Sequence, residues 1–187
     1  MDQRHHDIVQ TAFRLFSHYG VSKTSMTDVA TASNVARQTL YNAFDSKEDL
    51  IYAGLLHYAQ QARDKISQEC AEHVSPGERL DVLFQHLVAI PFEAMQSLPH
   101  LDEVLEIASH LPKKKCDDIT QTYIEAIHIV LAPYRQTLTK HGINYDTFCI
   151  FLKGTLTQLK RDADNPDQLS DLCEVVKSVL LVCIDKP

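Results

Sequence analysis

Residues 24–50 read TSMTDVATASNVARQTLYNAFDSKEDL, and this stretch decides the fold. Its apolar spacing predicts two short helices, 26–33 and 36–44, and the start of a longer helix at the end of the stretch. Only Ser33, Asn34 and Val35 separate the two short helices, so the chain must reverse within a tight turn. Two short helices with a tight turn and a polar second helix form a helix-turn-helix.

Local signals support these boundaries. Thr24 or Ser25 can cap the first helix, and Ser25 with Asp28 has the S-x-x-D spacing of a capping box. Asn34 tolerates the left-handed backbone conformation that such a turn requires. A second pair, Ser46 with Asp49, predicts where the long helix starts.

The helix 36–44 has two different sides at 100° per residue. The side that can pack inward carries Ala36, Leu40, Ala43 and Phe44. The opposite side carries Gln38, Tyr41 and Asn42, with Arg37 and Thr39 on its flanks. This outer side offers hydrogen-bond donors, one cation and one aromatic ring, but no carboxylate. Such a surface suits contact with phosphates and base edges.

Lys47 would lie in the first turn of the long helix, where the helix dipole opposes a cation. The arrangement is reasonable if an anion such as a phosphate binds at this helix end.

The stretch resembles the N-terminal DNA-binding domain of the TetR family (TetR/AcrR type) of bacterial transcriptional regulators, over roughly residues 6–55. The residues that carry the resemblance are Thr24, Ser25, Val29, Ala30, Thr39, Leu40, Tyr41, Phe44 and Lys47, including the pattern T-L-Y-x-x-F-x-x-K-x-x-L. Two positions depart from the family: Asn34 stands where Gly is usual, and Ala43 where His is frequent.

The resemblance implies a set of DNA contacts. Thr24 or Ser25, Tyr41 and Lys47 would contact the DNA backbone. The residues that would face the major groove are Arg37, Gln38, Thr39 and Asn42, with Val35 and Ala36 at its edge.

The composition is that of an ordinary globular protein, with 187 residues, 44% of them apolar, and a net charge of −7. Residues 1–50 carry five Lys or Arg against six Asp or Glu, so most of the acidic excess lies beyond them. The case for DNA therefore rests on motif and geometry, because no basic patch is evident. No long apolar run and no secretory signal appears, so we expect a cytoplasmic protein.

The number of cysteines is odd, and no C-x-x-C occurs, which predicts free thiols rather than a disulfide framework or a zinc site. They are Cys70, Cys116, Cys149, Cys173 and Cys183.

The remaining pattern predicts an all-α fold without strands. We expect an N-terminal three-helix helix-turn-helix domain, residues 1–50, followed by a helical ligand-binding and dimerisation domain, residues 51–187. The expected helices span about 3–19, 47–70, 78–97, 100–111, 113–141, 145–162 and 167–184. Pro91 and Pro133 should interrupt the helices in which they lie.

The last two helices, about 145–184, carry more apolar surface than one antiparallel pair can bury. A second copy of the chain would bury the excess as a four-helix bundle. Alternatively, this surface covers the chain's own middle helices. The TetR resemblance also implies a homodimer.

These features predict a ligand-responsive transcriptional repressor that binds a palindromic operator as a homodimer, is released by a small-molecule inducer, and is not an enzyme. No cofactor is expected. The candidate ligand-binding residues lie in the middle of the chain and are Phe92, Met95, Tyr123, Glu125, Ile127 and His128.

Two alternatives remain. Glu125 and His128 have the E-x-x-H spacing of helical di-iron enzymes, but only one copy occurs where two are needed. A helical interaction module that binds no DNA is the other alternative. The run Lys113-Lys114-Lys115 could meet an acidic partner, but we interpret it as a solvated helix start.

Overall fold

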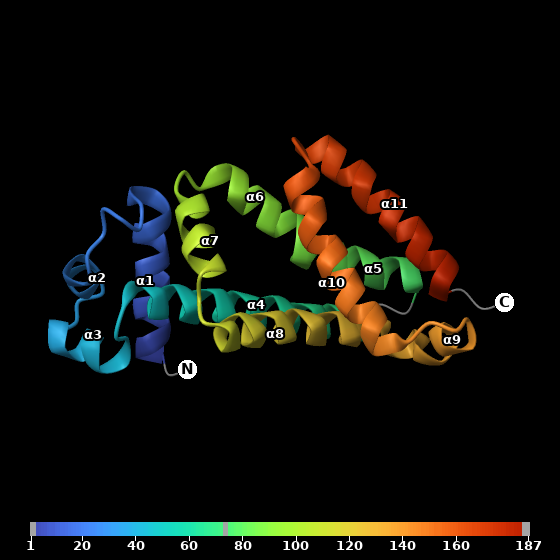
Figure 1. Cartoon of the computed structure of the whole chain (residues 1–187), viewed down its shortest axis with the longest axis horizontal. Coiled ribbons are helices and arrows are strands. Elements are labelled where there is room, and N and C mark those ends of the chain that lie inside the picture. Colours follow the sequence, from blue (N-terminus) through green and yellow to red (C-terminus); the bar gives the residue numbers. More distant parts are fainter. Residues whose placement is uncertain (1–2, 73–74, 185–187) are drawn as a thin grey trace. The chain divides into compact units, whose positions relative to one another are not determined.

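The computed structural model describes residues 3–72 and 75–184, and every regular element in these ranges is helical (Figure 1). The predicted all-α class is confirmed. Across the same ranges, no helix combines the length and the apolar character that crossing a membrane requires.

The helices occur near the predicted positions, with two irregular segments between them. They are α1 (Gln3–Tyr19), α2 (Met26–Ala32), α3 (Arg37–Ala43), α4 (Lys47–Glu72), α5 (Pro76–Phe84), the π-helical η1 (Gln85–Ala89), α6 (Ile90–Ser97), α7 (Leu101–Ser109), α8 (Lys113–Leu131), the 3₁₀-helical η2 (Ala132–Tyr134), α9 (Arg135–Lys140), α10 (Tyr145–Asp162) and α11 (Pro166–Ile184).

The chain folds as two compact units. The first comprises the described residues of Met1–Tyr58 together with Ala94–Ile119, and the second comprises those of Ala59–Glu93 and Thr120–Pro187. These units are defined by packing, whereas the division expected after residue 50 concerns function and stays a prediction. All five cysteines are free thiols.

One apolar core holds the first unit together, and it combines α1–α4 with α7. Phe16 of α1, Leu40 of α3 and Val104 of α7 are completely buried in it. The three helices of the predicted DNA-binding domain therefore share their core with a helix that lies more than 50 residues later in the chain.

Gly54 of α4 is buried directly against α1. A Cβ atom at this position would overlap the ring of Phe13. The close approach of the two helices thus requires a residue without a side chain at position 54. Gly77, in the first turn of α5, has open space around the position of its missing Cβ.

In the second unit, the interruption expected at Pro91 lies earlier, in the π-helical segment Gln85–Ala89. Proline has no N–H and its ring crowds the carbonyl four residues before it, which here is Leu87. That carbonyl accepts a hydrogen bond from Lys160 of α10, at 2.9 Å. Burial lowers the pKa of the Lys160 ammonium to about 8.

Arg79 of α5 plays a similar part where two helices end. Its guanidinium donates to the carbonyl of Cys70 near the end of α4 at 2.6 Å, and to those of Ile129 and Val130 near the end of α8 at 2.6 and 3.1 Å. Carbonyls in the last turn of a helix lack partners within it, and a cation also suits the negative end of the helix dipole.

We predict that Gly54→Ala lowers the free energy of unfolding by about 1–3 kcal/mol, because the new methyl group overpacks against Phe13. Gly77→Ala is the matched control and should leave stability unchanged or raise it by up to about 1 kcal/mol, since alanine favours the helix. Urea unfolding followed by circular dichroism measures both. Combining Gly54→Ala with Phe13→Leu should recover part of the loss, and equal effects of the two alanines would contradict the packing described above.

Candidate DNA-binding surface

The start of α2 confirms the predicted capping box. The Ser25 hydroxyl accepts from the backbone N–H of Asp28 at 3.2 Å, and the Asp28 carboxylate accepts from the backbone N–H of Ser25 at 2.8 Å. The hydrogen bonds from the Ser25 side chain and backbone lower the pKa of the Asp28 carboxyl. The cap fixes where α2 begins and thereby orients the turn that follows it.

That turn has the conformation predicted from Asn34, whose φ is 52°. Two backbone hydrogen bonds close it: the Asn34 N–H donates to Thr31 at 3.1 Å, and the Val35 N–H donates to Ala30 at 3.0 Å. The Asn34 side chain is exposed, so its backbone conformation rather than its packing matters here.

Two apolar side chains attach α3 to the core of the first unit. Leu40 is completely buried, and Phe44, directly after the helix, is 9% exposed. Ala36 was expected on the inner side, but it is exposed. The reason is that α3 begins only at Arg37, so Ala36 is the extended N-cap residue and does not follow the helical periodicity.

The outer side of α3 is available to a partner, as predicted. Arg37, Gln38 and Asn42 are exposed, and Thr39 and Tyr41 are partly exposed. Contacts within the helix orient these groups. The Gln38 amide donates to the Asn42 side-chain oxygen at 2.9 Å, and the Arg37 guanidinium lies 5.3 Å from the centre of the Tyr41 ring. This surface can offer hydrogen-bond donors, acceptors and a cation to a partner without any rearrangement of the core.

Lys47 and Thr24 have partners within the chain. The Lys47 ammonium donates to the carbonyl of Val21 at 2.7 Å, and the buried Thr24 hydroxyl donates to that of Gly20 at 2.9 Å. Both side chains thus hold the loop between α1 and α2. Lys47 keeps further N–H donors for an anion. The expected contacts of Thr24, Ser25 and Lys47 with the DNA backbone stay predictions.

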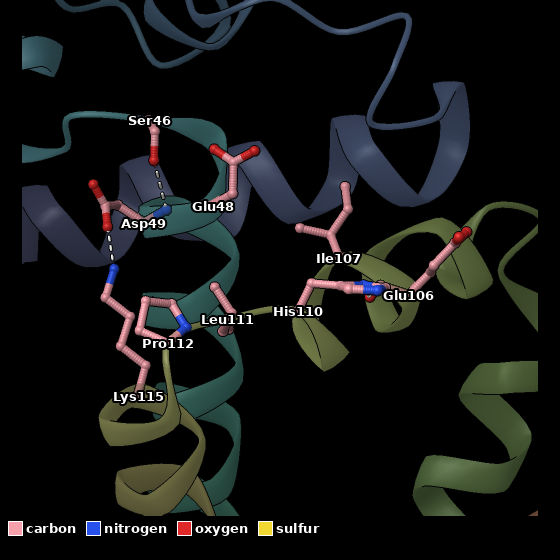
Figure 2. A pocket seen from close by; sticks show the side chains of 9 residues that line it. All are labelled: Ser46, Glu48, Asp49, Glu106, Ile107, His110, Leu111, Pro112 and Lys115. Carbon is pink, nitrogen blue, oxygen red and sulfur yellow. Dashed lines mark hydrogen bonds and ion pairs between the residues drawn. The ribbon is translucent and has the colours of Figure 1, made fainter.

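The start of α4 makes contacts that the sequence did not indicate. Ser46 accepts from the backbone N–H of Asp49 at 3.1 Å, but the Asp49 carboxylate pairs with Lys115 of α8 (Figure 2). The Lys115 ammonium also lies 5.1 Å from the centre of the Tyr52 ring. The interpretation of residues 113–115 as a solvated run was therefore wrong for Lys115, because a helix distant in sequence supplies its partner.

The candidate ligand-binding residues have different surroundings. Phe92 and Ile127 are buried and Tyr123 packs against the core of the second unit, whereas Met95 belongs to the first unit and is 38% exposed. Their assignment to a ligand site stays a prediction.

The Glu125-x-x-His128 pair does not converge on one partner. The Glu125 carboxylate lies 3.0 Å from Arg63 of α4. The His128 ring packs against the Tyr145 ring with 5.0 Å between centroids. Its Nε2 is 3.7 Å from Asp146, which is too long for a hydrogen bond.

Residues 8–53 match the family model of the bacterial regulatory proteins of the tetR family. The matched range is the N-terminal domain of the tetR family. The matched range covers α2, the Asn34 turn and α3, so the TetR resemblance read from the sequence is confirmed where its motif lies.

Curated relatives are similar to this chain over a longer range than the family model. An Escherichia coli K12 protein described as "Probable acrEF/envCD operon repressor" is 28% identical over 114 residues, which cover 59% of this chain and 47% of that protein. The chain therefore spans about half the length of the curated relatives it matches.

Solved structures are similar over nearly the whole chain. The TetR family repressor AlkX from Dietzia sp. strain DQ12-45-1b has a TM-score of 0.67 at 18% identity, with 97% of this chain and 98% of that chain covered. FadR from Bacillus subtilis, solved in complex with stearoyl-CoA, has a TM-score of 0.63 at 18% identity, with 96% and 97% covered. At these identities the likeness shows the fold.

We predict that Asn34→Val lowers the free energy of unfolding by about 1–2 kcal/mol, because a β-branched residue disfavours positive φ. Asn34→Gly should leave stability within about 0.5 kcal/mol of the parent, since glycine adopts this conformation freely. Thermal and urea unfolding measure both variants. The turn geometry would be contradicted if valine were tolerated as well as glycine.

Proposed function

We propose that this chain is a ligand-responsive transcriptional regulator, a repressor that binds a palindromic operator as a homodimer and is released by a small-molecule inducer. The observation that carries the proposal is the exposed side of α3, which has no carboxylate while Leu40 anchors the opposite side. The match to the tetR family model and the repressor description of the Escherichia coli relative support it.

In this proposal α3 is the recognition helix and enters the major groove. Arg37, Gln38, Thr39 and Asn42 face base edges, where arginine and amide side chains form paired hydrogen bonds with guanine and adenine. The residues that contact the backbone are Tyr41, Lys47 and either Thr24 or Ser25, with Val35 and Ala36 at the groove edge. The Gln38–Asn42 hydrogen bond holds both amides in place before DNA arrives.

A second copy of the chain would pack on the outer side of α10 and α11. Large apolar side chains are exposed there, namely Ile150, Phe151, Val175, Val179 and Val182. The inner sides of these helices already pack on the chain's own core through residues such as Leu156 and Leu180. Covering the middle helices therefore explains the inner sides, whereas the exposed outer residues favour a four-helix bundle between two copies.

A dimer with two-fold symmetry presents two α3 helices to successive major grooves, with half-sites roughly 34 Å apart or a multiple of it. An inducer lowers operator affinity if it binds more tightly to a state in which this spacing is lost. FadR was solved with stearoyl-CoA, which supports a small-molecule effector for this chain too. The metal-enzyme alternative finds no such support, because Glu125 and His128 contact different partners.

We predict that Tyr41→Phe and Lys47→Gln weaken binding to all DNA sequences, because each loses a contact with the DNA backbone. Lys47→Gln should also reduce the salt dependence of binding, because it removes a positive charge. Lys47→Gln keeps a donor for the Val21 carbonyl, so the loop should stay folded. Gln38→Ala should instead relax the preference at one base pair, by roughly 1–3 kcal/mol.

Fluorescence anisotropy with the duplex upstream of the chain's own gene and with an unrelated duplex separates the two classes. Glu72→Gln, an exposed change in the second unit, serves as the control and should leave both affinities unchanged. If every variant binds like the parent, α3 is not the recognition helix.

We predict that Val179→Glu converts the dimer into a monomer, since a charge at the centre of an apolar interface is left without a partner. Leu105→Glu introduces the same charge at an exposed apolar residue on α7, outside the proposed interface, and should leave the dimer intact. Analytical ultracentrifugation distinguishes the 21.2 kDa chain from its dimer. A parent that sediments as a monomer at micromolar concentration would exclude this interface.

A further inference from the structure

A cavity of about 500 Å³ opens beside the first turn of α4 (Figure 2). One wall is the start of α4, with Glu48 and Asp49. The other is formed by the end of α7 and the connection to α8. All its lining residues belong to the first unit. Its volume lies in the range that small-molecule sites occupy.

The floor of the cavity is apolar. Ile107, Leu111 and Pro112 contribute hydrocarbon surface, and Leu111 is only 7% exposed. Contact between water and such an apolar surface is unfavourable. A hydrocarbon group of a ligand would cover this surface and so remove it from water. The floor therefore favours a ligand with an apolar body.

The charges of the walls leave one negative group beside this floor. Lys115 and Asp49 neutralise each other, and their ion pair lowers the pKa of the Asp49 carboxyl. The Glu48 carboxylate has neither an ion pair nor a hydrogen bond among the residues that the structure describes. The carboxylate of Glu106 extends away from Asp49 and Lys115, on the far side of His110 (Figure 2).

We infer that this cavity binds a small amphipathic amine, whose ammonium group pairs with Glu48 and whose hydrocarbon body covers Ile107, Leu111 and Pro112. A carboxylate of the same shape would face Glu48 and be repelled. A metal ion is a poorer occupant, because no group of three His, Cys, Asp or Glu in residues 3–72 and 75–184 could hold one.

The position of the cavity connects this site to α3. Only Phe44, Asp45 and Ser46 separate α3 from α4, so the occupant lies against the turn that follows the recognition helix. The same region of α4 is joined to α8 by the Asp49–Lys115 ion pair and by the hydrogen bond from Tyr52 to Asp118, at 2.9 Å. A ligand that contacts both walls would therefore alter how the start of α4 is held against α8. If the proposed function holds, occupation of the cavity changes operator affinity.

Three probes with the same body and different head groups test the site: 4-phenylbutylamine, 4-phenylbutan-1-ol and 4-phenylbutanoate. Isothermal titration calorimetry on the full chain without DNA should show that the amine binds more tightly than the alcohol, and that the carboxylate does not bind. Glu48→Gln should lower amine affinity about five- to tenfold and leave alcohol binding unchanged. Glu106→Gln is the matched control and should alter neither. Equal binding of amine and carboxylate, or an unchanged Glu48→Gln variant, would overturn the inference.

Methyl NMR locates the amine independently of any variant. The Ile107 and Leu111 methyl signals should shift on titration, and shifts confined to other methyl groups would place the amine elsewhere and exclude this site. Because these measurements contain no DNA, they fail separately from the proposed function. If the chain binds the amine at Glu48 but binds no DNA duplex, the proposed regulatory function is refuted, whereas the amine site is supported.

Discussion

The burial of one side chain, Leu40, holds α3 in place while leaving its opposite side exposed. Helix α3 has seven residues, and an isolated helix of this length is not stable in water. Leu40 is completely buried in the core shared by α1–α4 and α7, and Phe44 adds a second anchor directly after the helix. Since so little of α3 is needed for packing, its other side chains are free to be selected for contact with a partner. Because packing constrains so few positions of α3, its exposed side can consist of residues without a carboxylate.

Sequence reasoning succeeded where a structural signal lies within a few neighbouring residues. The Ser25–Asp28 cap and the left-handed Asn34 depend on groups five or fewer residues apart, and both were identified correctly. The contacts that shape the cavity were missed, because Asp49 meets Lys115 and Tyr52 meets Asp118 across 66 residues of chain. Helical periodicity indicates which side of a helix is apolar, but it does not indicate which other helix will lie against it.

Two cations in the second unit show how charged side chains can stabilise an interior made of helices. Arg79 and Lys160 both donate to backbone carbonyls at places where the helical pattern ends or is interrupted, the first near two helix ends and the second in the π-helical segment in front of Pro91. An unpaired buried carbonyl would be costly, and a long flexible cation can reach it from a neighbouring helix. From composition alone, both residues would be assigned to the surface.

The π-helical segment before Pro91 also determines which side chain enters the core after it. A π turn contains one residue more than an α turn, so every later side chain is rotated by the step of one residue, roughly 100°, compared with an uninterrupted helix. Phe92, which follows this segment in α6, is 2% exposed and belongs to the core of the second unit. The segment therefore behaves like a tolerated one-residue insertion. The number of residues between α5 and α6, and not only their chemical nature, determines which side of α6 faces the core.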